Sequence, residues 1–326
     1  MIETSIYKYV LTKNISINEV NFENESDDKI FYSKFNDIYV LPKLWSVITN
    51  DFFIFRDFER FLSTYKHHKE ILLRQNEIKN KSESIIQNKG NFFLFGGENN
   101  YWHFMIDFMP RLLCLKKISY DGLKIIIPHN LDKKFQEFII KICNLLEINE
   151  IIFFKINTEN LIHSFENLIF TSNPGIAFTS SFFHKLLNNT IKKNKKRNLY
   201  AIRGNTVNRK VLNETDLIEL LKQYNYDIVD CASLSIEEQI KQFSEAKNII
   251  VPNGAAITNL LFVPDAINVV EIRSNLDGNF SKLINLNNRF NLYFFEKTIK
   301  VGQELRKNII VDIPAMKKLV EEKNLF

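Results

Sequence analysis

The first stretch of this sequence that could do chemistry holds a histidine and an aspartate four residues apart. His103 and Asp107 lie in NFFLFGGENNYWHFMIDFMPRL (91–112), and an i, i+4 spacing places both side chains on one face of a helix. Their apolar neighbours would partly desolvate them, which makes a carboxylate a better base. Arg111 could keep Asp107 ionised or could be a plain surface cation. Alternatively, His103 and Asp107 merely pair to close a buried polar gap.

The second stretch, LYAIRGNTVNRKVLNE (199–214), places Arg203 and Arg209 on either side of a polar loop. Guanidinium groups bind phosphate oxygens in a bidentate manner, so two of them at the carboxyl end of a strand can grip a diphosphate. The alternative is a pair of exposed loop cations. Asn213 and Glu214 look like an ordinary helix start.

The third and fourth stretches are NIIVPNGAAITNLLF (248–262) and INVVEIR (267–273). At Gly254, Ala255 and Ala256, small residues that open a helix would let backbone N–H groups approach an anion, helped by the helix dipole. Close packing is the alternative at this turn. Glu271 interrupts a buried run and could accept hydrogen bonds from a ribose or a sugar hydroxyl, or could pair with Arg273 or a neighbouring helix.

Several other kinds of site are disfavoured by the sequence. Neither G-x-G-x-x-G nor GxxxxGK[ST] occurs, which argues against a dinucleotide oxidoreductase and a P-loop ATPase. The six histidines show no ligand spacing and no Asp-x-Asp follows a strand, so we predict no metal and no cofactor.

The elements that must position these residues alternate from about residue 92 onward. Short apolar runs such as KIIIP (124–128) and EIIFFKI (150–156) are separated by amphipathic segments such as 101–117 and 133–146. This alternation predicts parallel βαβ units in an α/β protein. We expect a domain at 1–165 with a β-rich lead-in over 1–65, and a doubly wound domain at 166–326, with a cleft between them.

Composition indicates an ordinary globular protein. Of 326 residues, 45% are hydrophobic and 25% are charged, which excludes disordered and fibrous classes. The net charge of +5 is scattered apart from the short run 192–197, so no nucleic-acid partner is expected. Three separated cysteines suggest buried thiols in a reducing compartment. With no signal-type or membrane-spanning run, we expect a cytoplasmic location, with peripheral docking on the inner face of the cell membrane as an option.

Taken in order, these stretches resemble glycosyltransferase family 61, which includes bacterial capsular-polysaccharide enzymes. The likeness is carried by Asn100 through Trp102 and His103 to Asp107 and Arg111, by Tyr200 to Glu214, and by Gly254 to Asn259 followed by Glu271. It implies a GT-B fold of two Rossmann-like domains, a nucleotide-sugar donor that is usually UDP-linked, and inversion at the anomeric carbon. Many bacterial members carry histidine just before Gly-Ala, where this chain has Asn253.

Carried over residue by residue, the resemblance implies that Asp107 and His103 are catalytic. It also matches Arg203 and Arg209 to the arginines of the family. We expect the donor to be bound by Arg203, Arg209, Asn253, Gly254, Ala255, Ala256, Asn259 and Glu271, and the acceptor side to lie near Asn100, Trp102 and Arg111. We expect Asp107 to take the proton of an acceptor hydroxyl, oriented by His103 or exchanging roles with it. The acceptor would be a glycan or lipid-linked glycan. Two alternatives remain open: a non-catalytic nucleotide-sugar or glycan-binding protein, and a GT-B-like nucleotide-sugar epimerase.

Overall fold

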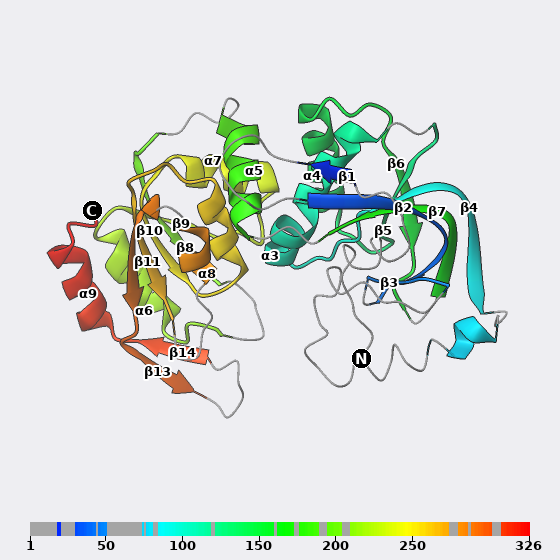
Figure 1. Ribbon diagram of the computed structural model, residues 1–326. Coiled ribbons are helices and arrows are strands. Elements are labelled where there is room, and N and C mark those ends of the chain that lie inside the picture. Colours follow the sequence, from blue (N-terminus) through cyan, green and yellow to red (C-terminus); the bar gives the residue numbers. More distant parts are fainter. Residues whose placement is uncertain are drawn as a thin grey trace. The chain divides into compact units, whose positions relative to one another are not determined.

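The computed structural model of the chain divides into two compact units (Figure 1). Unit 1 comprises residues 1–99 and 103–178, and unit 2 comprises residues 100–102 and 179–326. The structure describes residues 18–20, 30–43, 45–50, 74, 76–80, 84–118, 121–159, 162–172, 176–188, 194–203, 209–273, 280–285, 288–301 and 308–326. Most of the lead-in at 1–65, the loop 204–208 and the lysines at 192 and 193 lie outside these described residues.

Unit 1 is built on a mixed sheet whose strands run in the order β1-β2-β7-β4-β5-β6, with β3 paired to β2. Strands β7, β4, β5 and β6 are parallel to one another, whereas β1, β2 and β3 pair in antiparallel fashion. The strand order reverses between β4 and β7, because the chain leaves β4 towards β5 and β6 and later returns to the other side of β4. The strands are β1 Asn18–Val20, β2 Ile30–Leu41, β3 Ser46–Ile48, β4 Ile85–Leu94, β5 Lys124–Pro128, β6 Ile152–Ile156 and β7 Ile162–Thr171.

The connection from β4 to β5 is a helical segment of three successive geometries: α3 Tyr101–His103, the π-helix η2 Phe104–Phe108 and the 3₁₀-helix η3 Met109–Lys117. The sequence predicts its extent but not its irregularity. Pro110 has no N–H and its ring collides with the carbonyl four residues earlier, so a regular α-helix cannot run through this point. The segment packs beside α4 (Lys133–Leu145), with the Phe104 and Phe135 rings 4.3 Å apart.

Unit 2 contains an all-parallel sheet in the order β12-β11-β10-β8-β9. From β8 the chain goes to the edge strand β9 and then returns to β10 on the other side of β8, so the strand order reverses between β8 and β10. The strands are β8 Arg197–Ala201, β9 Tyr226–Val229, β10 Ala246–Pro252, β11 Asn268–Ile272 and β12 Asn291–Phe295. Parallel strands covered on both faces read as continuous apolar runs, and β10 and β11 are buried along most of their length.

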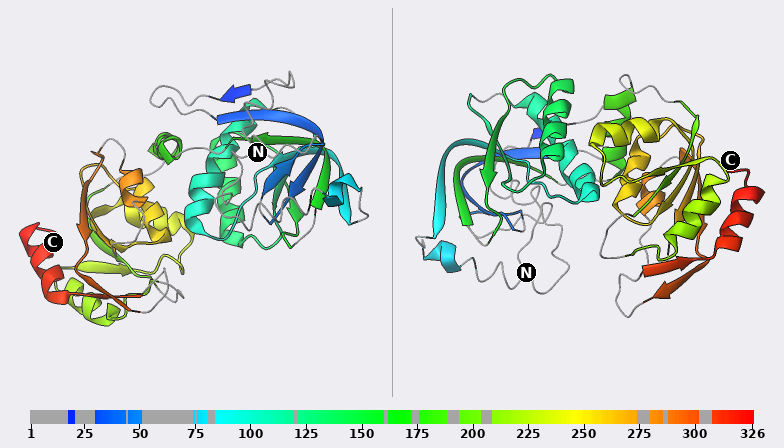
Figure 2. Two further views of the ribbon diagram at one scale, coloured as in Figure 1. Left: turned by 60° about the horizontal axis from the view of Figure 1, so that its bottom comes forward. Right: turned by 180° about the vertical axis from the view of Figure 1, so that it is seen from behind.

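Helices cover both faces of this second sheet (Figure 2). On one face α6 and α9 bury Leu217, Leu221, Met316 and Val320 against the strands. On the other lie α7, α8 and the 3₁₀-helix η4, and α5 leads the chain into the unit. The bounds are α5 Ile176–Asn188, α6 Glu214–Lys222, α7 Ile236–Ser244, η4 Ala255–Leu261, α8 Phe280–Ile284 and α9 Ile313–Glu322, and a hairpin of β13 Thr298–Val301 and β14 Asn308–Val311 precedes α9.

The predicted α/β class with parallel sheets is confirmed, and KIIIP is β5 to the residue. Within the predicted β-rich lead-in, residues 30–41 form one continuous strand, the twelve-residue β2. Asp37 does have a left-handed φ of 49°, yet β7 pairs with β2 on both sides of it and keeps the strand continuous.

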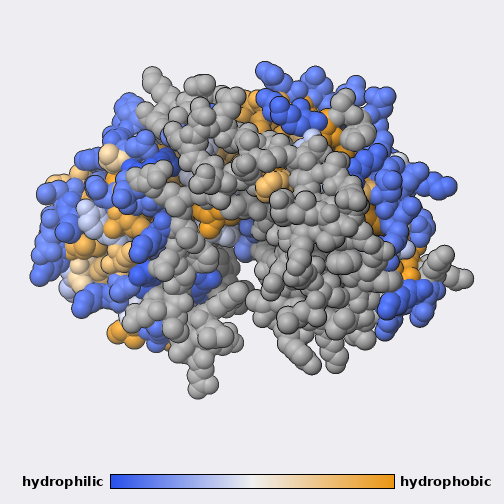
Figure 3. Space-filling view, in the orientation of Figure 1, coloured by the Kyte–Doolittle hydropathy of each residue, from blue (hydrophilic) through white to orange (hydrophobic). Residues whose placement is uncertain are grey.

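The described surface mixes hydrophilic and hydrophobic residues (Figure 3). None of the described helices has the length and the apolar composition needed to cross a membrane. None of the three cysteines is in a disulfide, and burial raises the pKa of Cys143 to about 12. Cys231 is only half-buried, so the expectation of buried thiols holds for Cys114 and Cys143 alone.

Four asparagines form a ladder across the amino ends of the strands of unit 2. Asn248 donates to Asn198 at 2.9 Å, Asn268 donates to Asn248 at 2.8 Å, and Asn291 donates to Asn268 at 3.0 Å. These residues are register partners on β8, β10, β11 and β12, so each amide stacks on the next. Asn248 lies between Asn198 and Asn268 and is 1% exposed, against 9% for Asn198, so it is a fully buried member of the ladder.

Replacing Asn248 should destabilise unit 2 without touching its carboxyl edge. In Asn248→Ala the Asn198 oxygen and the Asn268 amide lose their partners, and we expect the free energy of unfolding to fall by about 1–3 kcal/mol. Urea denaturation measures the change. Asn291→Ala removes only the exposed end of the ladder and should change stability by no more than about 0.5 kcal/mol. Equal losses in the two variants would contradict a cooperative ladder.

Candidate active site

His103 and Asp107 form a hydrogen-bonded pair in unit 1. His103 Nδ1 lies 2.8 Å from Asp107 Oδ2, and the two side chains are 30% and 15% exposed. The pair is therefore partly shielded but not enclosed, unlike a pair that closes a buried polar gap. Between the two residues begins the π-helix η2, in which the Met109 N–H donates to the carbonyl of Phe104 five residues earlier. Such turns are rare and occur often at functional sites.

Gly96, in the Gly-Gly turn that precedes this helical segment, has no room for a side chain. Gly96 has a φ of +81°, and a Cβ added there would lie 2.7 Å from the Phe108 ring. Trp45 donates its indole N–H to the carbonyl of Gly97 at 3.1 Å. Gly96 is thus required both by its backbone conformation and by the ring it touches.

Arg111 is buried, with 2% of its surface exposed, so the expectation of a plain surface cation is wrong. Its Nη1 donates to the carbonyl of Phe95, the residue after β4, at 3.1 Å. The guanidinium carbon also lies 4.8 Å from the centre of the Phe108 ring. A buried guanidinium needs such partners, and here they tie the helical segment that carries His103 and Asp107 to the end of β4.

Asn100 and Trp102 belong to unit 2 and start the same segment of chain. Asn100 Oδ1 accepts a hydrogen bond from the backbone N–H of Trp102 at 3.1 Å, so Asn100 caps the start of α3. Asn99 instead joins the loop before α4, where it accepts from the N–H of Asp132 and donates to the carbonyl of Asn130. Trp102 is 9% exposed.

Arg203 and Arg209 converge on Asn253 in unit 2. Arg203 Nη1 donates to the backbone oxygen of Asn253 at 2.6 Å, and Arg209 Nη1 donates to its side-chain Oδ1 at 2.5 Å. Both arginines are partly buried and held, so the alternative of loose exposed cations is wrong. Among the described residues, no carboxylate lies within ion-pair distance of Arg209.

This cluster lies where the strand order of unit 2 reverses. Arg203 follows the end of β8 by two residues, and Asn253 comes directly after β10. In open parallel sheets, ligands bind outside the carboxyl ends of the two strands that flank such a reversal. The arginines are therefore at the edge of the sheet where a ligand is expected.

Glu271 anchors the cluster from inside the sheet. Its side chain is fully buried; Oε1 accepts from Asn253 Nδ2 at 2.5 Å, and Oε2 accepts from the hydroxyl of Ser281 in α8. Of the two structural alternatives for Glu271, the contact with a neighbouring helix is therefore present. The pairing with Arg273 is wrong, because Arg273 forms its ion pair with Glu296 at 2.9 Å.

Gly254 leaves room for an arginine. A Cβ added at Gly254 would lie 1.6 Å from Arg203 Nη1, so close packing is what the small residue permits at this position. Ala255 and Ala256 are partly buried and begin η4, a 3₁₀-helix of only seven residues. The helix dipole expected to favour an anion is correspondingly short, which leaves the guanidinium groups as the source of positive charge.

Asn259 is not joined to the arginines. Its Oδ1 accepts from the hydroxyl of Tyr101 at 2.8 Å, and its Nδ2 donates to Gln239 at 2.9 Å. Burial raises the pKa of Tyr101 well above its ordinary value, with Cys231 and Glu237 adding to the shift, so this hydroxyl stays protonated and donates. Asn259 thus fixes Tyr101 within unit 2.

The sequence profile of the family described as Glycosyltransferase 61 matches residues 101–270, which is more than half of the chain. The chain belongs to the glycosyltransferase 61 family. It is therefore a glycosyltransferase, with a sugar donor and a glycan acceptor as its substrates. The match includes the His103–Asp107 pair, both arginines and Asn253, and it ends one residue before Glu271. No curated protein matches the chain.

Two supporting residues of this glycosyltransferase were missed by sequence reasoning. Glu214, taken for an ordinary helix start, accepts from the hydroxyl of Tyr200 at 3.0 Å and from the backbone N–H of Arg203 at 3.3 Å. Ser281, on α8, was not singled out at all. An acidic residue is common in the first turn of any helix, and a serine carries no spacing signal, so neither could be recognised without the fold.

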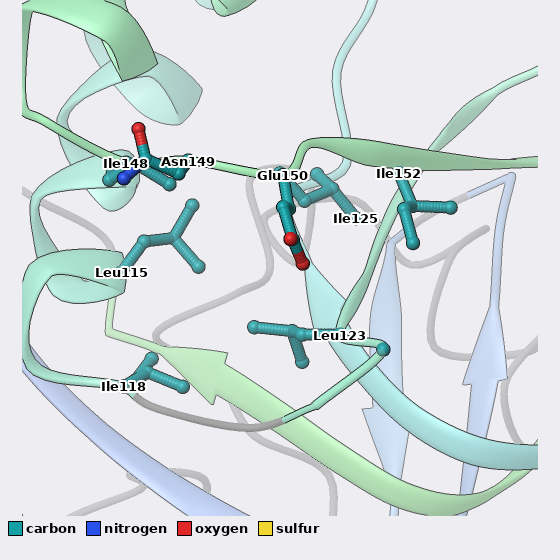
Figure 4. Close-up of a pocket in the computed structure, with 9 residues that line it drawn as sticks. Leu115, Ile118, Leu123, Ile125, Ile148, Asn149, Glu150 and Ile152 are labelled. Carbon is teal, nitrogen blue, oxygen red and sulfur yellow. The ribbon is translucent and has the colours of Figure 1, made fainter.

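A pocket in unit 1 lies apart from all of the predicted site residues (Figure 4). It is found near the amino ends of β5 and β6 and is lined by Leu115, Ile118, Gly122, Leu123, Ile125, Ile148, Asn149, Glu150 and Ile152. Its mostly aliphatic lining offers little to a phosphate or a sugar. Within the described part of the chain, no three His, Cys, Asp or Glu side chains are grouped as a metal ion would need.

Gly254→Ala should separate ligand binding from folding in this glycosyltransferase. The backbone at Gly254 is extended, with φ 165°, so alanine causes no backbone strain, but its methyl group must displace the Arg203 guanidinium. We expect pyrophosphate binding, measured by calorimetry, to weaken about tenfold, with an unchanged melting temperature. Gly122→Ala is the converse control: its φ is +65° and its surroundings are open, so it should lower stability and leave binding intact.

Proposed function

We propose that this glycosyltransferase moves a sugar, with inversion at the anomeric carbon, from a nucleoside diphosphate sugar to a hydroxyl of a glycan acceptor. The observation that carries the proposal is the convergence of Arg203 and Arg209 on Asn253 at the strand reversal of unit 2. UDP is the first nucleotide to test. Guanidinium groups match the geometry of phosphate oxygens and stay charged at any physiological pH.

The arginines would stabilise the leaving group. As the bond between the anomeric carbon and the diphosphate breaks, negative charge grows on the departing phosphate oxygens. Positive groups that are already fixed in place stabilise that charge without reorganising during the reaction. Asn253 fixes Arg203 through its backbone and Arg209 through its side chain, and we propose that this positive charge serves in place of a metal ion.

The geometry of the pair in unit 1 favours His103 as the base and Asp107 as its partner. An ionised aspartate can only accept hydrogen bonds, so the 2.8 Å contact then requires the proton to be on His103 Nδ1. Nε2 keeps its lone pair in that tautomer and can take a proton. The carboxylate then stabilises the imidazolium that forms, as in other carboxylate–histidine pairs. The sequence favours Asp107 as the base and His103 as the residue that orients it; in the present proposal the two roles are exchanged.

The proposed reaction is one displacement. The acceptor oxygen forms a bond to the anomeric carbon, its proton passes to His103 Nε2, and the bond from that carbon to the diphosphate oxygen breaks. The bonding electrons leave with the nucleoside diphosphate. Attack on the face opposite the leaving group inverts the anomeric configuration, and the protonated His103 later releases its proton to solvent.

Three broader proposals accompany this chemistry. Each unit has its own sheet with parallel strands, which supports a GT-B type of fold with two Rossmann-like domains, divided near residue 165. Free cysteines support a cytoplasmic enzyme, with peripheral membrane association where the acceptor is lipid-linked. Family membership supports a role in surface or capsular polysaccharide synthesis.

Variants of the pair should lose turnover and keep donor binding. We expect His103→Ala and Asp107→Asn to lower kcat by about 10²- to 10⁴-fold, the usual contribution of a positioned base. UDP affinity should not change in either variant. Added imidazole should restore part of the activity of His103→Ala, while added formate should not restore Asp107→Ala. The opposite pattern of rescue would make Asp107 the base. NMR of the product tests inversion.

Arg209→Ala should weaken donor binding, with about a tenfold to hundredfold rise in the Kd for UDP, since a charge-assisted contact to phosphate is lost. A panel of UDP-, GDP-, TDP- and CMP-linked sugars identifies the donor, and the monophosphate of CMP donors should be the poorest fit. Unaltered UDP affinity in Arg209→Ala would remove this residue from the site. Donor epimerisation without acceptor, or no release of nucleotide from any donor, would instead favour an epimerase or a pure binding protein.

A further inference from the structure

The side-chain amide of Asn253 can face either way, and only one way serves Arg209. Its Oδ1 accepts from Arg209 Nη1, and its Nδ2 donates to Glu271 Oε1, both at 2.5 Å. A rotation of the amide by half a turn would point the NH₂ group at the guanidinium, where two donors would meet. Arg203 is indifferent to this rotation because it binds the backbone oxygen of the same residue.

Glu271 decides the orientation. A carboxylate that can only accept holds the NH₂ end of the amide towards itself and so turns the oxygen towards Arg209. Glu271 is fully buried, and ionised groups in such positions need several hydrogen bonds. Ser281, also fully buried, donates its hydroxyl to the other carboxylate oxygen. The path from Ser281 through Glu271 and Asn253 ends at Arg209.

We propose that Ser281 and Glu271 are positioning residues that set the orientation of the Asn253 amide and thereby hold Arg209 ready for the diphosphate of the donor. The inference rests on the proposed donor site. It assigns a role in donor binding to Ser281, a residue of α8 that follows β11 and packs beside η4. Without the serine, the carboxylate loses one of its donors and its hold on the amide weakens.

The test is a set of pyrophosphate affinities measured by calorimetry. Pyrophosphate has the diphosphate group of the proposed donor, and its use does not require the nucleobase of that donor to be known. We expect Ser281→Ala to weaken its binding about tenfold, in the range expected for losing a hydrogen bond to a charged group. Ser281→Thr keeps the hydroxyl and should restore most of the affinity. Glu271→Gln keeps the shape but no longer demands the NH₂ end of Asn253, and should show a comparable loss.

Double variants separate positioning from a general loss of structure. When Arg209 is already alanine, adding Ser281→Ala should weaken pyrophosphate binding by less than about twofold, because the guanidinium that Ser281 helps to position is absent. In the Arg203→Ala background, the full effect of Ser281→Ala should persist, because Arg203 does not depend on the amide's orientation. A similar effect of Ser281→Ala in both backgrounds would overturn the proposal.

Ser244→Ala is the matched control. Ser244 is another buried serine of unit 2, 2% exposed, and its hydroxyl donates to the carbonyl of Lys241 within α7. It should leave pyrophosphate affinity unchanged. If Arg209→Ala weakens binding and Ser281→Ala does not, the positioning role fails while the donor site stands. If the unaltered protein does not bind pyrophosphate, the donor site and the positioning role both fail.

Discussion

In unit 2, one side-chain amide connects a carboxylate, which can only accept hydrogen bonds, to a guanidinium, which can only donate them. The buried Glu271 carboxylate is the acceptor, the Arg209 guanidinium is the donor, and the amide of Asn253 lies between them. Aspartate in place of Asn253 would put a second negative charge beside Glu271, and leucine would take away one hydrogen-bond partner from Glu271 and one from Arg209. A neutral histidine also has one donating and one accepting nitrogen, so by the same reasoning it is the other uncharged side chain that could join these two partners.

The same constraint leaves the charge of Arg209 available to a ligand. If Arg209 were paired directly with a carboxylate, its positive charge would be largely neutralised before any ligand arrived. Placing the carboxylate one residue further away, inside the sheet, fixes the guanidinium in position and leaves its charge available to an anion. Gly254 belongs to this arrangement, because the space of its missing side chain is filled by Arg203. The small residue two positions after β10 therefore makes room for the guanidinium of Arg203.

Sequence patterns predicted the elements of this protein better than the contacts of its polar residues. Apolar runs such as KIIIP mark buried parallel strands directly, since their burial depends on local composition. The arginines, Asn253 and Glu271 could be placed at one edge of the sheet because they follow or end successive strands. The hydrogen-bond partners of these residues could not be predicted from the sequence. Glu271 accepts hydrogen bonds from Asn253 and Ser281, and Arg111, expected near Asp107 or at the surface, is buried. Those pairings depend on side-chain directions and on a helix, α8, without a distinctive pattern.

The irregular geometry of the helical segment 101–117 in unit 1 has two causes, the proline at position 110 and the packing of aromatic side chains. Pro110 prevents an α-helical bond to the carbonyl of residue 106, and the chain forms a π-turn before the proline and a 3₁₀-helix that begins at Met109 and contains it. A π-turn gives up part of the regular backbone hydrogen bonding, so neighbouring contacts must stabilise it. Here Phe104 packs on Phe135, while Phe108 lies against Gly96 and Arg111. Because the His103–Asp107 pair straddles the start of this turn, the same aromatic contacts that stabilise the π-turn also fix the distance between the imidazole and the carboxylate.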